Sequence, residues 1–83
     1  MRFGLYCIYD KYTGYMVPAH HQNDNQAIRA FAYDINNAGD NIIKANVEDF
    51  ALHKVGYFDT ETGLIEPCKI EILADAGSLL RKE

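Results

Sequence analysis

The sequence predicts an α+β fold in the order β-β-α-β-β: a four-stranded antiparallel sheet, made from two β-hairpins, with one helix packed on it. The first observation is a pattern that occurs twice, over residues 9–18 and 58–67: an aromatic residue, Asp, two variable residues, Thr, Gly, two apolar residues, one variable residue and Pro. The second is a single stretch of helical periodicity between the two copies. The third is the length of 83 residues, which indicates one small domain over 1–83 with a modest core.

Residues 2–9 are predicted to form the first strand, because they are almost wholly apolar or aromatic. Alternation sends the side chains to two faces, and both faces are apolar: Phe3, Leu5, Cys7 and Tyr9 on one, Tyr6 and Ile8 on the other. A strand of this kind is typically covered on both sides. In so short a chain, we expect a partner subunit to supply part of that cover.

Residues 10–14 are predicted to be the first turn. Gly14 ends this short polar loop and can adopt positive φ without steric cost, while Asp10 can accept hydrogen bonds from the turn amides. The return strand is expected over residues 15–20. Because Pro18 has no amide hydrogen to donate, this strand should lie at a sheet edge or end there.

The helix is predicted from Asp24 to about Asn37. Asn23 stands at the N-cap position, with Gln26 three residues later, which is the spacing of a capping box. Apolar residues recur at helical spacing along this stretch: Ala27, Ile28, Phe31, Ile35 and Ala38. Residues 36–39 contain a helix stop signal, and residues 40–49 form a long connection without a firm pattern.

The second hairpin repeats the design of the first. The third strand is predicted over 50–58, the turn over 59–63, and the fourth strand over 64–73. In the fourth strand Cys68, Ile70 and Ile72 alternate with Lys69 and Glu71, which is typical of a half-buried antiparallel strand. Residues 74–83 are expected to add a short, weak helical turn.

The charge of the chain argues against general coating of a phosphate backbone. Eight Lys and Arg residues stand against twelve Asp and Glu, a formal net charge of −4, whereas proteins that bind nucleic acid by charge alone are usually basic. No apolar run approaches the ~20 residues of a membrane helix, and no signal-peptide pattern opens the chain. We therefore expect a cytoplasmic protein without membrane contact, in which Cys7 and Cys68 are reduced thiols.

No group of residues predicts catalysis, a metal site or a cofactor. His20 and His21 would point to opposite faces of a strand, and no nearby Cys or carboxylate completes a zinc pattern. Glu48 and Asp49 could act as an acid/base pair, but nothing supplies a nucleophile beside them, so capping or ion pairing is the simpler interpretation. The duplicated turns lack the Gly-Lys-Ser/Thr of a phosphate-binding loop. We expect a protein that is not an enzyme.

The aromatic residues, six Tyr and four Phe, are the remaining indication of function. Tyrosines on a sheet face or a hairpin tip can stack unpaired bases, at about 1–3 kcal/mol per base. The alternative is that they pack in the core or at an interface. The candidate nucleic-acid contacts combine tyrosines with cations on the predicted strands and the first hairpin tip: Arg2, Tyr6, Lys11, Tyr12, Lys54, Tyr57 and Lys69.

Three segments together resemble a known family. They are Ala27-Ile28-Arg29-Ala30-Phe31, Val47-Glu48-Asp49-Phe50-Ala51-Leu52, and Gly56-Tyr57-Phe58-Asp59 through Thr62-Gly63. In this combination the chain resembles the small nonstructural protein of gokushovirus-type microviruses, which are phages with single-stranded DNA genomes. In that family a Pro often precedes the Glu-Asp pair, where this chain has Val47. The resemblance implies a non-capsid phage protein in the cytoplasm of the infected bacterium, with a DNA-binding role in genome replication.

Two functions follow as hypotheses. The first is a single-stranded DNA-binding accessory of viral genome replication that acts as a homodimer, with tyrosines stacking bases and Arg2, Lys54 and Lys69 forming a local basic stripe. The second is a non-enzymatic interaction module that recruits or regulates a viral or host replication protein. The net charge of −4 and the apolar second face of the first strand motivate the second hypothesis.

Overall fold

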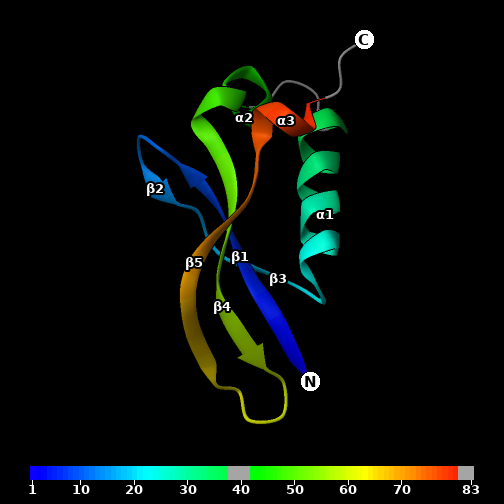
Figure 1. Ribbon diagram of the computed structural model, residues 1–83, viewed down its shortest axis with the longest axis vertical. Coiled ribbons are helices and arrows are strands. Elements are labelled where there is room, and N and C mark those ends of the chain that lie inside the picture. The colour runs from blue at the N-terminus through cyan, green and yellow to red at the C-terminus, as the bar shows by residue number, and fades with distance from the viewer. Residues whose placement is uncertain (38–41, 81–83) are drawn as a thin grey trace.

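The computed structural model describes residues 1–37 and 42–80 (Figure 1). Its strands are β1 (Arg2–Asp10), β2 (Gly14–Tyr15), β3 (Ala19–His21), β4 (Phe50–Asp59) and β5 (Ile65–Asp75). Its helical segments are α1 (Asp24–Asn37), α2 (Ile42–Ala45), the 3-10 turn η1 (Val47–Asp49) and α3 (Ala76–Leu79). The predicted α+β class, with an antiparallel sheet, one main helix and a short C-terminal helical turn, is confirmed.

The sheet places β1 and β4 at its centre. The strand order is β2-β1-β4-β5, β3 also pairs with β1, and every pairing is antiparallel. The two hairpins therefore join through β1 and β4, which pair along almost their whole length. In Figure 1 the long β4–β5 hairpin extends beyond the N-terminal end of α1.

Both duplicated segments are hairpin turns of the same construction, as predicted. Asp10 and Asp59 each accept, through Oδ1, a hydrogen bond from the backbone amide two residues later, at 3.0 and 2.9 Å. Gly14 and Gly63 end the loops with φ of 98° and 75°. These values lie in the left-handed region that only glycine enters cheaply. The repeated Asp and Gly are thus used to form the turns.

The return strand of the first hairpin differs from the prediction. Instead of one strand over residues 15–20, the short strands β2 and β3 pair with β1 and residues 16–18 separate them. Pro18 cannot donate a hydrogen bond to β1, so the ladder is interrupted there. Both short strands lie on the outer side of β1, at the sheet edge where the proline was expected.

Helix α1 begins where the sequence predicts. Asn23 Oδ1 accepts the amide of Gln26 at 2.8 Å, and Gln26 Oε1 accepts the amide of Gln22 at 2.9 Å. The reciprocal bond of the capping box therefore reaches one residue further back than in the standard motif. The helix ends at Asn37; the Ala38 and Gly39 of the predicted stop signal lie outside the described residues.

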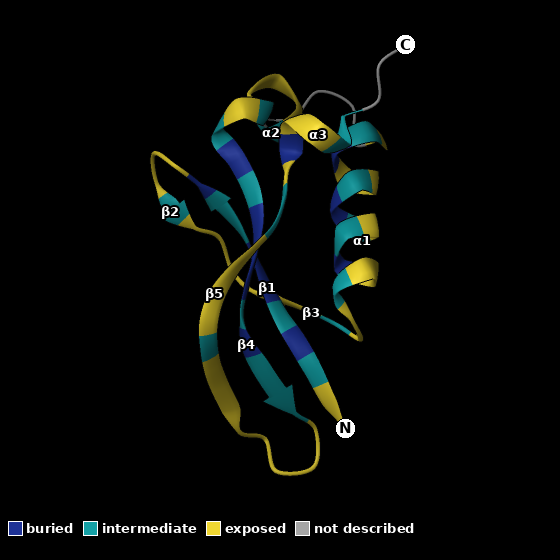
Figure 2. Ribbon diagram, viewed as in Figure 1, coloured by how far each residue is buried: buried dark blue, intermediate teal, exposed yellow. Residues whose placement is uncertain are grey.

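The core lies between α1 and one face of the sheet (Figure 2). Its buried members come from α1, α3, β1 and β4: Tyr6, Ala27, Phe31, Ile35, Phe50, Leu52 and Ala76. The described part of the long 40–49 connection forms α2 and η1, whose Ile43 and Val47 pack against this core. The described helices thus pack on the side of the sheet to which Tyr6 points.

Strand β5 is less buried than its alternating pattern predicted. Of the three apolar residues in this pattern, Ile70 and Ile72 are 46% and 72% exposed, and only Cys68 is half-buried. Figure 2 shows most of this strand as exposed. The strand lies at the edge of the sheet, and its register with β4 shifts at two places. Alternation identifies side chains that share a face, but it does not determine whether another element covers that face.

The face opposite α1 carries the other apolar set of β1, as expected. The register between strands adds residues of β2 to β5 to this surface, which we call the helix-free face. It comprises Phe3, Leu5, Cys7, Tyr9, Tyr15, His20, Ala51, His53, Phe58, Ile65, Pro67, Ile72 and, opposite Ala51, Asp75.

Candidate nucleic-acid interface

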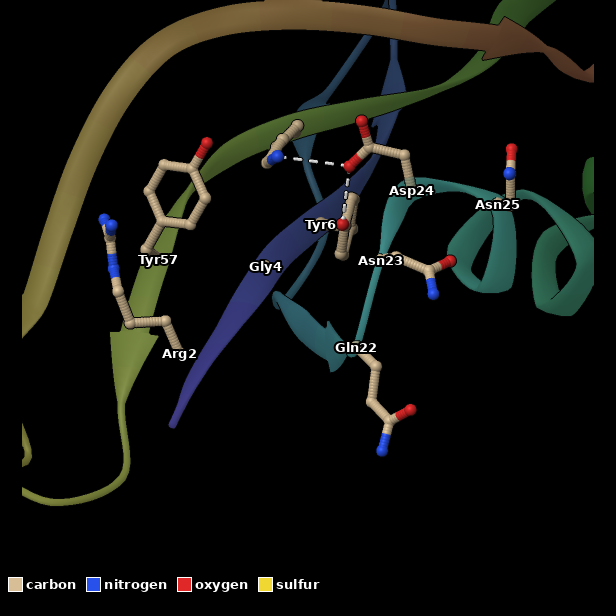
Figure 3. A pocket seen from close by; sticks show the side chains of 9 residues that line it. Arg2, Gly4, Tyr6, Gln22, Asn23, Asp24, Asn25 and Tyr57 are labelled. Atoms are coloured by element: carbon tan, nitrogen blue, oxygen red, sulfur yellow. Dashed lines mark hydrogen bonds and ion pairs between the residues drawn. The ribbon is translucent and has the colours of Figure 1, made fainter.

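A polar cleft of about 490 Å³ opens between β1, β4 and the N-terminal end of α1 (Figure 3). We call it the Arg2–Tyr57 cleft. Nine residues line it: Arg2, Gly4, Tyr6, Gln22, Asn23, Asp24, Asn25, Lys54 and Tyr57. Four of the seven predicted contact residues, Arg2, Tyr6, Lys54 and Tyr57, therefore meet at one place.

The pairing of β1 with β4 explains why these four residues lie together. Gly4 pairs with Tyr57, and Tyr6 pairs with Lys54, across the β1–β4 ladder. The register shifts between these pairs, so that Val55 of β4 has no partner in β1. Residues three apart in a regular strand point to opposite faces. The irregularity instead allows Lys54 and Tyr57 to line the same cleft.

Gly4 leaves room for the Tyr6 ring at the cleft floor because it has no side chain. A Cβ atom there would lie 2.6 Å from Cζ of the Tyr6 ring, which folds back over the glycine. Such an approach is closer than any ordinary carbon contact, so another residue at this position would displace Tyr6. Gly4 thus allows the tyrosine to reach α1.

Two cations lie against the ring of Tyr57. The Arg2 guanidinium carbon is 4.3 Å and Lys54 Nζ is 4.6 Å from the ring centroid. Arg2 also forms an ion pair with Glu66 at 3.2 Å, in which the two side chains are 54% and 63% exposed. Exposed pairs contribute at most about 1 kcal/mol, so the Arg2 head can exchange this partner for another anion at little cost.

The Lys54 ammonium is held much more firmly. Only 11% of its side chain is exposed, and Nζ lies 3.1 Å from Asp24 Oδ1, which also accepts the Tyr6 hydroxyl at 2.7 Å. Burial lowers the pKa of Lys54, but hydrogen bonding with Tyr57 and Asp24 outweighs it and raises the pKa above its usual value. Burial and the bond to Asp24 likewise raise the pKa of Tyr6. This cluster joins the start of α1 to the sheet.

The structure separates the other predicted contacts from the cleft. Tyr12 is 76% exposed at the β1–β2 tip, beside Lys11, whose Nζ pairs with Asp49 at 3.2 Å. Lys69 lies on exposed β5 and does not line the cleft. Tyr6 lines the cleft but is only 2% exposed, so its ring packs in the core and is closed to a stacking base.

Sequence reasoning missed the polar side of the cleft. Gln22, Asn23 and Asn25 line it from the start of α1, together with Asp24. The run of polar residues over 22–25 was the available signal, but only Asn23 of this run was given a role, as the helix N-cap. The helix start in fact has a second role, because its amide side chains face the same space as Tyr57.

Neither a metal centre nor a membrane span is found in the part of the chain that the structure describes. No three or more His, Cys, Asp or Glu side chains gather there in a way that could hold an ion. None of its helices is long and apolar enough to cross a membrane.

Comparison with known protein families identifies the family of this chain. A family model described as "Phage ORF5 protein" matches residues 3–79. The chain belongs to this family. The match includes every residue of the Arg2–Tyr57 cleft except Arg2, and it confirms the prediction of a phage protein. No curated protein and no solved structure matched the chain.

Proposed function

We propose that this Phage ORF5 family protein binds single-stranded DNA at the Arg2–Tyr57 cleft. In this proposal it is the nonstructural protein of a gokushovirus-type microvirus and an accessory of viral genome replication in the bacterial cytoplasm. The observation that supports the proposal best is the Tyr57 ring with the Arg2 and Lys54 cations against it, at the edge of a polar cleft. An aromatic ring beside cations is the combination that binds unpaired bases and their phosphates.

Each part of the cleft would have its own task. Arg2 would release Glu66 and bind a phosphate, and its movement would leave a face of Tyr57 open to a base. The side-chain amides of Gln22, Asn23 and Asn25 can both donate and accept hydrogen bonds, as base edges require. Lys54 would add positive potential without leaving Asp24.

The charge distribution limits the strength of this binding. The chain has a net charge of −4, and Asp24 and Glu66 lie beside the two cations of the cleft. Contact with one to three phosphates would give a slope of about −0.7 to −2 for log K against log salt, because single strands contribute about −0.7 per neutralised phosphate. We therefore expect modest affinity that is clearest at low salt.

Fluorescence anisotropy with a labelled oligothymidine tests the proposal. Tyr57→Ala should weaken binding about 5- to 150-fold, the equivalent of one lost stacking contact of about 1–3 kcal/mol. Tyr33→Ala is the matched control, because Tyr33 is 65% exposed on α1 and does not line the cleft. Absence of binding by folded protein at low salt, or equal losses in the two variants, would contradict the proposal.

Charge variants provide an independent comparison. Arg2→Ala should reduce the salt slope by about 0.7, because one phosphate contact is lost. Lys69→Ala removes the same charge from a position outside the cleft and should leave the slope unchanged. A larger effect of Lys69 than of Arg2 would move the DNA contact to β5.

The alternative function is a non-enzymatic module that recruits or regulates a viral or host replication protein. The net charge of −4 and the apolar helix-free face favour it. Co-purification from infected cells, with and without nuclease, distinguishes the two. A partner complex that survives nuclease supports the module, whereas a complex that nuclease dissolves supports DNA binding.

A further inference from the structure

The helix-free face has an aromatic cluster at one end. Tyr9 stacks on His53 with ring centroids 4.8 Å apart and planes 14° apart, and the Tyr15 hydroxyl lies 3.1 Å from His53 Nδ1. Tyr15 also packs against Tyr9 at 4.8 Å and remains 49% exposed. The imidazole therefore has its hydrogen bond within the cluster, and the cluster presents mainly ring surface.

The other end of the face is hollow and apolar. Phe3, Leu5, Pro18, His20, Phe58 and Thr60 line a depression of about 270 Å³. At the β5 edge the side chains of Ile65 and Ile72 are 68% and 72% exposed. Contiguous apolar surface of this kind is uncommon on monomers and typically marks an interaction site.

The charge on this face favours a second copy of the chain over a nucleic acid as its binding partner. Among the described cross-strand pairs that form it, the one charged residue is Asp75, which pairs with Ala51 and whose Oδ1 accepts the Ser78 amide at 2.9 Å. Burial lowers the pKa of His53, which favours its neutral form at neutral pH. A face without cations gives a phosphate backbone no counter-charge. It is, however, compatible with its own copy, because two such faces can meet without bringing the net charge of −4 of each chain into direct contact.

The size of the face sets the expected strength of such a contact. Four strands at a spacing of about 4.8 Å, over about seven residues of 3.3 Å each, cover on the order of 450 Å². Two copies would bury roughly 900 Å² by this projection, below the ~1,200 Å² at which stable interfaces begin. This area is typical of a weak dimer that forms at micromolar or higher concentration.

We propose that the helix-free face binds a second copy of this chain, sheet against sheet, around a two-fold axis. The same patch then serves both subunits, as a symmetric dimer requires. The partner covers the second apolar side of β1, and the two Arg2–Tyr57 clefts stay on the outer surfaces of the dimer, on the α1 sides of the sheets. The inference does not depend on DNA binding.

Sedimentation velocity from about 1 to 300 μM tests this inference. The wild-type protein should shift from monomer to dimer over this range, and Ile72→Lys should raise the dissociation constant at least tenfold. Tyr33→Lys is the matched control, since it adds the same charge at an exposed apolar residue on α1 and should dimerise like wild type. Ile65→Lys is a second variant at an equally exposed site, and circular dichroism checks that each variant is folded.

Three results would overturn the inference. The first is a wild-type monomer at 300 μM. The second is equal dimerisation of the Ile72→Lys and Tyr33→Lys variants. The third is a change in oligothymidine affinity for Ile72→Lys that Tyr33→Lys does not show, under conditions where wild type is monomeric, which would make the face a nucleic-acid surface. A failure of DNA binding alone would leave the dimer result intact.

Discussion

The ion pair between Lys54 and Asp24 should respond unequally to removal of its two ends. The Lys54 side chain is 11% exposed and that of Asp24 is 41% exposed. Asp24→Asn leaves a nearly buried ammonium without its carboxylate. Lys54→Met leaves a carboxylate that water can reach and that still accepts the Tyr6 hydroxyl at 2.7 Å. The first change should therefore destabilise the fold more than the second.

The exposed fractions of the two side chains determine how much stability each substitution should remove. Removing one partner of a fully buried pair costs about 3–5 kcal/mol, because an uncompensated charge remains. Since water partly reaches this pair and asparagine still offers an acceptor, we expect about 2 kcal/mol for Asp24→Asn. For Lys54→Met we expect about 1 kcal/mol or less, because methionine keeps most of the apolar contact of the lysine stem.

Urea unfolding followed by circular dichroism at pH 7 measures both changes. The double variant should be about as stable as Lys54→Met alone and more stable than Asp24→Asn, because the stranded ammonium is then absent. If Lys54→Met costs as much as Asp24→Asn or more, the assignment of Lys54 as the desolvated member of the pair is wrong.

Three further predictions concern the sheet and its turns. Gly56→Ala should lower the free energy of unfolding, measured by urea, by about 1–3 kcal/mol, because the added Cβ would collide with a backbone carbonyl of β5. Gly77→Ala is the control: its added Cβ would have no contact closer than 3.6 Å, so the stability should not fall. Gly63→Ala should cost about 1–2 kcal/mol from backbone strain alone, since φ is 75° and no atom lies near the added carbon; an unchanged midpoint would mean that the turn adopts another conformation. Burial lowers the pKa of His53 and of His21 in the folded protein, so the unfolded state binds protons more readily. The free energy of unfolding should therefore fall as the pH drops from about 6.5, the usual histidine pKa, towards the lower pKa values of the folded state. His53→Gln should flatten this dependence between pH 7.5 and 5, and an unchanged dependence would assign it to other groups.

Local sequence signals were sufficient for the elements that depend on local chemistry. The two Asp-to-Gly turns, the start of α1 at Asn23 and the apolar faces of β1 follow from turn, capping and alternation rules, and each is present in the structure. The break of the return strand at Pro18 was only half predicted. The proline indicated an edge position. It did not indicate that the residues on both sides of it, in β2 and β3, would pair with the same strand, β1.

The candidate site depends on non-local register, which the sequence does not display. Lys54 and Tyr57 are three residues apart, and regular alternation would place them on opposite faces. Their common cleft results from the irregular pairing around Val55, and Arg2 joins them only because β1 pairs with β4. Similarly, the exposure of Ile72 follows from the edge position of β5, which alternation along the strand cannot reveal.

The most direct test of the account is a titration of ¹⁵N-labelled protein with oligothymidine at low salt, followed by amide chemical shifts. The account predicts that the perturbed amides cluster around Gly4, Tyr57 and residues 22–25, with small changes at the Tyr12 tip. Shifts confined to that tip or to the helix-free face, or no shifts for the folded protein, would contradict a DNA site at the Arg2–Tyr57 cleft.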